Sequence, residues 1–182
     1  YIGYSDNTVV QSFLLKNNFA SIHAQTIKTS SFGVTEESYD LIFDVLNGKL
    51  PKYSIEKNNF NKPGNAEGEL VGGNLALIYA LLGTSYSFNF QDKILFIEDI
   101  GEKYYALDRM LISLELAGVF RKIKGLIIGG MTNMGDEKDN KNYEESFDEQ
   151  FEAVLKLKPA IFSFVFGLLK SEYINAAKKE QI

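Results

Sequence analysis

The chain has 182 residues, of which 45% are hydrophobic and 13% aromatic, enough for one ordinary domain with an apolar core, or one small domain and part of another. Its net charge of −5 disfavours nucleic-acid and anionic membrane partners, which need a basic face. The lack of cysteine excludes disulfides, thiolate metal sites and a cysteine nucleophile, and no apolar run reaches the roughly 18 residues of a membrane span.

Short apolar segments alternate with polar turns in the first 48 residues. The opening Tyr1-Ile2-Gly3, without a methionine or a visible signal peptide, is typical of the last residues of a strand, so we expect a fragment. N-cap residues favour a helix over residues 7–17, followed by a short strand over residues 19–24. Residues 36–46 have helical apolar spacing that ends before Gly48.

The rest of the chain begins with a segment rich in Pro, Gly, Asn and Lys over residues 49–69, which predicts a linker with one short strand near residues 53–56. Beyond it the pattern predicts strands at residues 69–71, 93–99, 124–130 and 160–166, helices at residues 75–82, 104–117 and 147–157, and a charged loop at residues 136–145. Strands alternating with helices indicate an α/β architecture with buried parallel strands.

The first candidate site is the turn Gly3-Tyr4-Ser5-Asp6, between the end of a strand and the start of a helix. A serine on such a turn projects its hydroxyl outward, and the following backbone N–H groups and the helix dipole favour an oxyanion. The alternative is that Ser5 or Asp6 only caps the helix. The turn alone favours capping, because Asn7 stands where the G-x-S-x-G pattern has its second glycine.

The second candidate is the pair Glu98-Asp99 at the carboxyl end of an apolar strand, where α/β proteins tend to place ligands. A buried carboxylate there can orient a histidine, which is the third role in a Ser-His-acid triad. The alternative is structural, with one acid capping the following turn or pairing with Arg109. The sequence contains one histidine, His23, and a lone histidine near a strand end is more often a binding or packing residue than a base.

Two glycine segments form the third candidate. Gly72-Gly73-Asn74 opens a predicted helix and could bind a phosphate through free N–H groups. It lacks the Lys-Ser/Thr of a P-loop and the spacing of a dinucleotide fingerprint. We therefore interpret it, and Gly129-Gly130, as sites of close packing between helix and strand.

Taken together, these segments resemble one family, the LD-carboxypeptidases, which comprise the muramoyltetrapeptide carboxypeptidases and the related microcin C immunity proteins. The motifs follow the family's order and rough spacing. They are Gly3-Tyr4-Ser5-Asp6-Asn7-Thr8, His23 after a short strand, Gly72-Gly73-Asn74-Leu75 to Leu82-Gly83-Thr84, Leu95-Phe96-Ile97-Glu98-Asp99, Asp108-Arg109-Met110-Leu111 and Gly125-Leu126-Ile127-Ile128-Gly129.

The resemblance implies a serine peptidase with a Ser-Glu-His triad. By this resemblance Ser5 matches the nucleophile, Glu98 matches the triad acid, the N–H of Asp6 supplies half of the oxyanion hole, and His23 lies at the substrate-facing wall. The implied domains are the end of a flavodoxin-like N-terminal nucleophile domain (residues 1–48), a linker (49–68), a C-terminal α/β domain of the LD-carboxypeptidase type (69–167) and a divergent tail (168–182).

The sequence departs from the family in three places. The family's glycine-rich loop upstream of the serine turn is not part of this sequence, and the segment at His23 reads His-Ala-Gln-Thr where the family usually has His-Gly-Pro-Met. The triad histidine normally follows a glycine after the last apolar strand, whereas here Gly167 is followed by Leu168 and no histidine occurs downstream. A serine without its base stays a poor nucleophile, so this form of the chain can be inactive.

The resemblance thus implies a cytoplasmic hydrolase, a serine-type LD-carboxypeptidase of peptidoglycan recycling that removes the terminal D-amino acid from murein tetrapeptides without a metal or other cofactor. One alternative is a non-catalytic remnant that binds muropeptides or acyl-peptides, and another is a microcin-C-type immunity hydrolase. The expected partner is a muropeptide or other small peptide rather than a nucleic acid or a membrane. The intact family member is expected to be a homodimer.

Overall fold

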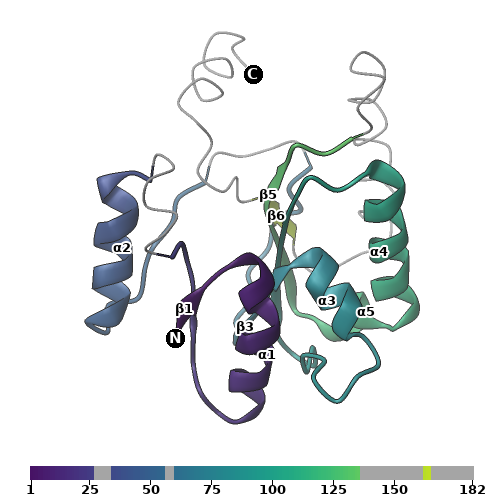
Figure 1. The fold of residues 1–182 in the computed structure, drawn as a ribbon, viewed down its shortest axis with the longest axis horizontal. Coiled ribbons are helices and arrows are strands. Elements are labelled where there is room, and N and C mark those ends of the chain that lie inside the picture. Colours follow the sequence, from purple (N-terminus) through teal and green to yellow (C-terminus); the bar gives the residue numbers. More distant parts are fainter. Residues whose placement is uncertain (27–33, 56–59, 136–161, 165–182) are drawn as a thin grey trace, which may run out of the picture.

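The computed structural model describes residues 1–26, 34–55, 60–135 and 162–164. Its strands form two parallel sheets (Figure 1). The smaller sheet contains β1 (Ile2–Gly3) and β2 (Ile22–His23), and the larger has the order β3 (Leu70–Asn74), β4 (Ile94–Ile100), β5 (Gly125–Thr132), β6 (Phe162–Phe164). The helices are the 3-10 helix η1 (Ser5–Asn7), α1 (Thr8–Lys16), α2 (Glu36–Leu46), α3 (Leu75–Leu81), α4 (Tyr104–Leu116) and α5 (Val119–Lys122). None of the helices within the described ranges is long and apolar enough to cross a bilayer.

The predicted α/β architecture with parallel strands is confirmed. The helix predicted over residues 36–46 has the same bounds, and the other predicted helices of the described ranges differ by a residue or two at their ends. The strand predicted near residues 53–56 is wrong for residues 53–55, which form no strand, and residue 56 lies outside the described residues. The helix over 147–157, the loop over 136–145 and the tail 168–182 also lie outside them. The domain boundaries stay a prediction.

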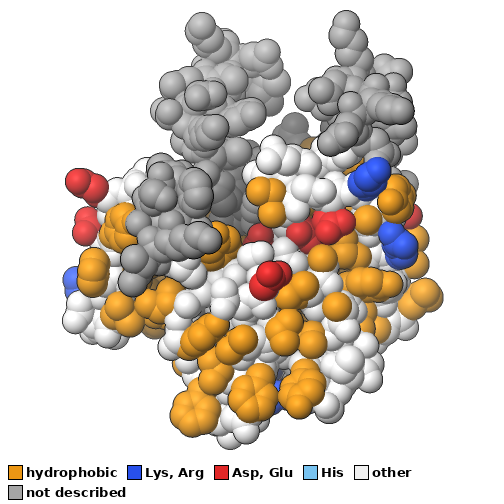
Figure 2. All heavy atoms as spheres, in the orientation of Figure 1, with side chains coloured by type: hydrophobic (Ala, Val, Ile, Leu, Met, Phe, Trp, Pro, Cys, Tyr) orange, Lys and Arg blue, Asp and Glu red, His pale blue; other side chains and the backbone are white. Residues whose placement is uncertain are grey.

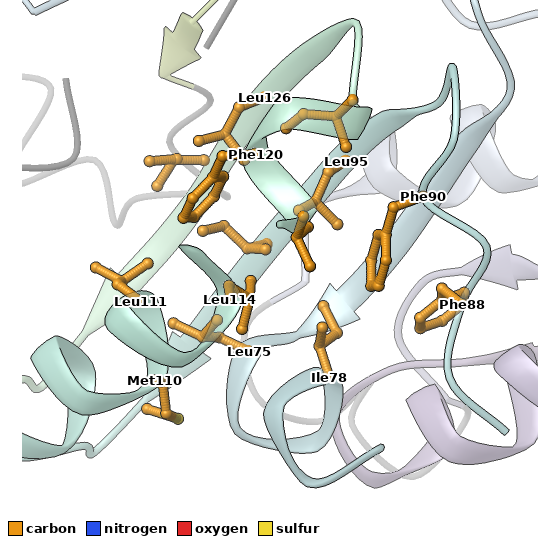
Figure 3. Packing of buried hydrophobic residues seen from close by; sticks show 14 of the residues in the cluster. Leu75, Ile78, Phe88, Phe90, Leu95, Met110, Leu111, Leu114, Phe120 and Leu126 are labelled. Atoms are coloured by element: carbon orange, nitrogen blue, oxygen red, sulfur yellow. The ribbon is translucent and has the colours of Figure 1, made fainter. Parts of the chain in front are cut away.

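The core lies between the larger sheet and the helices α3, α4 and α5 (Figure 3). Side chains alternate along β4, so that Leu95 and Ile97 point into this core and are fully buried, while Phe96 and Glu98 point to the opposite face. Leu114 of α4 is also fully buried in the core. Burial of each such side chain contributes about 1.5–3 kcal/mol, so the larger sheet gives the opposite face a rigid support.

The close packing between helix and strand predicted for the glycines is confirmed for Gly73, whereas Gly72 and Gly129 pack against the strand β4, and Gly72 and Gly73 lie within β3 instead of opening α3. A Cβ on Gly72 would lie 1.8 Å from the carbonyl oxygen of Phe96, and one on Gly73 would lie 2.5 Å from Thr8 Oγ1. A Cβ on Gly129 would lie 2.8 Å from the Phe96 ring. These contacts place α1 and the neighbouring strands closer together than any side chain would permit.

Helix α1 has its polar face buried and its apolar face exposed. Thr8, Gln11 and Ser12 are buried, at helical spacing of three and four residues, whereas Val10 and Phe13 are 40% and 49% exposed. Hydrophobic side chains gather over this part of the surface in Figure 2. On the buried face Ser12 Oγ donates to the carbonyl oxygen of Tyr86, and at the exposed end of the helix Lys16 Nζ donates to that of Ser85. Both hydrogen bonds tie α1 to the segment that follows α3.

Candidate active site

Ser5 lies on a sharp turn between β1 and α1, in the left-handed backbone region with φ of 55°. The other non-glycine residues of the described ranges with positive φ are Asn18, Asp92 and Asn133, which belong to the two residue types that tolerate this region best. Serine is not such a type, and the conformation costs on the order of 1–3 kcal/mol. A strained serine between a strand and a helix is the geometry of a nucleophile elbow.

The alternative that Ser5 or Asp6 caps the helix is wrong. The N-cap residues are Tyr4 for η1 and Asn7 for α1, and neither helix has a side-chain cap hydrogen bond. The turn is instead braced by Asn7, whose Nδ2 donates to the carbonyl oxygen of Tyr4 at 3.0 Å and whose Oδ1 accepts from the hydroxyl of Tyr1. Asp6 is exposed in η1, directly after Ser5.

A buried chain of hydrogen bonds joins the start of α1 to the end of β4. Thr8 Oγ1 accepts from the backbone N–H of Asn74 at 3.0 Å, and the Asn74 side chain donates to Asp99 Oδ1 at 2.8 Å. Asp99 also accepts from the N–H groups of Ala76 at 2.9 Å and Ile100 at 2.8 Å. Asp99 is therefore a structural acid that accepts hydrogen bonds at the end of β4 and at the start of α3, instead of capping the turn after the strand.

Glu98 differs from Asp99 because one of its oxygens has no hydrogen-bond partner. Its Oε1 is buried without a hydrogen-bond partner, which is costly for an acceptor. Burial, and secondarily the charge of Asp99, raise the pKa of Glu98 to about 7. The alternative of an ion pair with Arg109 is not found within the described ranges, where the guanidinium instead lies over the Tyr105 ring, 5.4 Å from its centre.

A bulge in β5 lies opposite Glu98. Ile97 pairs with Ile128 and Asp99 pairs with Met131, so three steps along β5 match two steps along β4. The extra residue falls at Gly129-Gly130. Bulges of this kind redirect side chains beside active sites, and Glu98 lies near the carboxyl edge of the sheet, where α/β proteins bind ligands.

His23 meets Glu98 on the face of β4 away from the core. Its Nε2 lies 3.7 Å from Glu98 Oε1, its ring packs edge-on against Phe96 with centres 5.4 Å apart, and its Nδ1 lies 3.3 Å from Gln11 Oε1. Burial lowers the pKa of His23. The ring is thus half-buried and packs beside Glu98, in keeping with the binding or packing role expected from the sequence.

The structure brings two of the four predicted site residues, His23 and Glu98, into contact, and it links the segment of Ser5 and Asp6 to them indirectly. The turn with Ser5 lies against β3, and the neighbour of Glu98 across β3 and β4 is Asn74. Among the residues that the structure describes, no three His, Asp or Glu side chains come close enough to hold a metal ion.

Residues 67–173, more than half of the chain, match the family model for the LD-carboxypeptidase C-terminal domain. The chain belongs to the LD-carboxypeptidase family. Glu98 and the bulge opposite it lie within the matched range. The Ser5 turn precedes the matched range, so its assignment depends on relatives that extend further.

Individual LD-carboxypeptidase relatives align with nearly the whole chain. The probable murein peptide carboxypeptidase of Bacillus subtilis is 32% identical over 174 residues, which cover 91% of this chain and 53% of that protein. The crystal structure of muramoyltetrapeptide carboxypeptidase from Oxalobacter formigenes has a TM-score of 0.70 at 28% identity and covers 93% of this chain and 57% of the other. The chain spans about half the length of the curated relatives that it matches.

The microcin C7 self-immunity protein in its wild-type apo state has a similar fold. It superposes with a TM-score of 0.69 at 23% identity over 91% of this chain and 58% of that protein. At this identity the likeness extends to the fold alone.

Three residues that contact or support the site were missed from the sequence, namely Thr8, Gln11 and Asn74. The helical spacing of Thr8, Gln11 and Ser12 predicts that they share one polar face of the helix, but not that this face is buried. For Asn74 the sequence indicates only a place in a glycine-rich segment. Its side chain both caps α3 by accepting from the N–H of Leu77 at 3.1 Å and binds Asp99.

Proposed function

We propose that this chain carries the nucleophile, Ser5, and the triad acid, Glu98, of a serine-type LD-carboxypeptidase that releases the terminal D-amino acid from murein tetrapeptides. The observation that carries the proposal is the left-handed φ of Ser5 on the turn between β1 and α1. Strain of this kind persists at functional sites where the surrounding structure enforces it. Here the enforcing contacts are those of Asn7 with Tyr1 and Tyr4.

The chemistry follows from the roles of the groups. Ser5 Oγ attacks the carbonyl carbon that precedes the D-amino acid, a histidine base takes the hydroxyl proton and then protonates the leaving amine, and water hydrolyses the acyl-enzyme. Glu98 holds that histidine and stabilises its imidazolium form. The N–H of Asp6, next to the nucleophile, stabilises the oxyanion.

The buried Oε1 of Glu98 supports its assignment as the triad acid. An unsatisfied acceptor beside a carboxyl edge is suited to receive an N–H group. An arriving N–H donor would also lower the pKa of Glu98 from about 7, and so favour the charged form that the mechanism needs. His23 faces this oxygen at 3.7 Å, which is longer than a hydrogen bond, so we assign His23 to the substrate wall and not to the base.

Because His23 is the only histidine of the 182 residues, we further propose that this chain by itself binds the tetrapeptide but does not turn it over at a measurable rate. Murein recycling in the cytoplasm and a homodimer of the intact family member remain predictions that accompany the proposed reaction.

The test is release of D-alanine from an L,D-tetrapeptide by the purified chain, together with calorimetric binding of the same peptide. Ser5→Ala serves as the test variant, and Ser54→Ala, at an exposed serine outside the site, as its matched control. We expect binding by all three proteins and no release. Release that Ser54→Ala retains and Ser5→Ala abolishes would support the nucleophile but refute the inactivity, and would require a search for the base that starts with His23. Release that Ser5→Ala retains would refute the assignment of Ser5.

A further inference from the structure

The buried side chain of Gln11 connects both strands of the smaller sheet. It is 5% exposed, and its Nε2 donates to the carbonyl oxygen of Gly3 at 3.0 Å and to that of Ile22 at 3.2 Å. Carbonyl oxygens can only accept hydrogen bonds, so the NH₂ group of the amide has to face them. The hydrogen-bond network therefore fixes which end of the amide is oxygen.

The orientation of this amide determines which nitrogen of His23 carries the proton. The remaining atom, Gln11 Oε1, lies 3.3 Å from Nδ1 of His23 and can only accept. Nδ1 must then be the donor. Burial lowers the pKa of His23, so at neutral pH the ring is neutral and has a single N–H, which leaves the lone pair on Nε2.

The lone pair of Nε2 faces the unsatisfied oxygen of the candidate triad acid. Nε2 and Glu98 Oε1 are 3.7 Å apart, and no other partner reaches that oxygen among the described residues. A lone pair opposite a carboxylate is repulsive, and the neighbouring Asp99 adds a second negative charge. The Phe96 ring packs edge-on against His23 and is apolar. It therefore offers no hydrogen-bond donor to His23 Nε2 or to Glu98 Oε1.

We propose that Gln11 is a positioning residue that holds neutral His23 as the Nδ1–H tautomer and so denies Glu98 Oε1 a hydrogen bond from this ring. Without that hydrogen bond the protonated form of Glu98 stays favoured relative to an ordinary carboxyl group until another N–H group reaches it. The inference concerns the protonation of the site and holds whether or not the proposed peptide is the substrate.

The single histidine makes the test direct. In ¹⁵N-labelled chain at a pH well above about 6.5, the ordinary pKa of histidine, a long-range ¹H–¹⁵N spectrum shows which ring nitrogen carries the proton. We expect Nδ1–H as the main form in the unaltered chain. In Gln11→Met, which keeps the shape but loses the acceptor, we expect Nε2–H as the main form and a fall in the pKa of Glu98, followed by the ¹³C shift of its carboxyl group.

Gln91→Met, at an exposed glutamine far along the chain, is the matched control and should change neither signal. Nε2–H as the main form in the unaltered chain, or an unchanged tautomer in folded Gln11→Met, would overturn the proposal. If Gln11→Met does not fold, the tautomer of the unaltered chain decides the matter, since Nε2–H as its main form would by itself overturn the proposal.

Discussion

Thr8 and Asn74, 66 positions apart in the chain, are joined by a buried hydrogen bond of 3.0 Å from the backbone N–H of Asn74 to Thr8 Oγ1. Thr8 is three residues after Ser5, and Asn74 is the register neighbour of Glu98. The bond therefore ties the turn of the candidate nucleophile to the strand of the candidate acid. Gly73 permits this approach because any Cβ there would collide with Thr8 Oγ1.

Loss of the Thr8 hydroxyl should destabilise the protein more than loss of its methyl group. Thr8→Val keeps the shape but leaves the N–H of Asn74 buried without an acceptor, which costs about 1–3 kcal/mol. Thr8→Ser keeps the acceptor and should cost about 1 kcal/mol for the lost methyl group. Urea unfolding of both variants measures the difference, and equal or reversed costs would show that the hydrogen bond does not hold the two segments together.

Ser5 should be a position where glycine is tolerated at least as well as alanine. Both substitutions remove the hydroxyl, but alanine retains a Cβ in the left-handed region, at about 1–2 kcal/mol, whereas glycine adopts it freely at a smaller cost in chain entropy. We expect Ser5→Gly to equal or exceed Ser5→Ala in stability by up to about 1 kcal/mol.

Ser113, in the interior of α4, provides the control for this comparison. There glycine should be about 1 kcal/mol worse than alanine. The same order at both serines in thermal unfolding would mean that the backbone of Ser5 is not strained.

Glu98 should make the stability of the chain fall with rising pH. Its pKa is raised from the ordinary 4.5 to about 7 in the folded state, so between these values the folded state binds more protons than the unfolded state. The destabilisation is absent below pH 4.5, develops as the pH rises, and is complete above about 7. Glu98→Gln should therefore be more stable than the unaltered chain at about pH 8, by roughly 1–3 kcal/mol.

His23 contributes a pH dependence of opposite sign, because its pKa is lowered and its stabilisation is lost as the pH falls below the ordinary value of 6.5. The difference between the two proteins at each pH reports the loss of the Glu98 carboxyl group together with its coupling to His23, which lies 3.7 Å away. Urea midpoints measured across this range provide the data. A difference that stays constant with pH would contradict a raised pKa for Glu98.

The fold was predictable wherever local pattern decides it. The apolar run of β4 and the apolar spacing of α2 and α4 are local signals of strand and helix, so the positions of these elements were correct to within a few residues. The wrong strand at residues 53–55 came from apolar and aromatic residues in a polar segment. Propensity alone does not form a strand without a neighbour to pair with.

The site was only half predictable for a different reason. Ser5 and Glu98 stand at element ends, which the sequence marks. The contact of Thr8 with Asn74 joins segments far apart in the sequence. The contact of Gln11 with His23 depends on which face of α1 is buried. Helix α1 buries its polar face, opposite to the usual rule, so its apolar pattern pointed to the wrong side. The sequence also does not distinguish the roles of Glu98 and Asp99, because the hydrogen bonds that make Asp99 structural come from Asn74 and Ala76, distant in the chain.

The most direct test of the central claim is chemical rescue by imidazole, supplied in solution in place of a triad histidine. Glu98 Oε1 has no hydrogen-bond partner, and the triad base is the catalytic side chain that Ser5 is proposed to lack in this chain. D-Alanine release from an L,D-tetrapeptide is measured with increasing imidazole for the unaltered chain, Ser5→Ala and Glu98→Gln. The account predicts release that rises with imidazole in the unaltered chain, is absent from Ser5→Ala and is strongly reduced in Glu98→Gln. No imidazole-dependent release from folded protein, or release that Ser5→Ala retains, would contradict it.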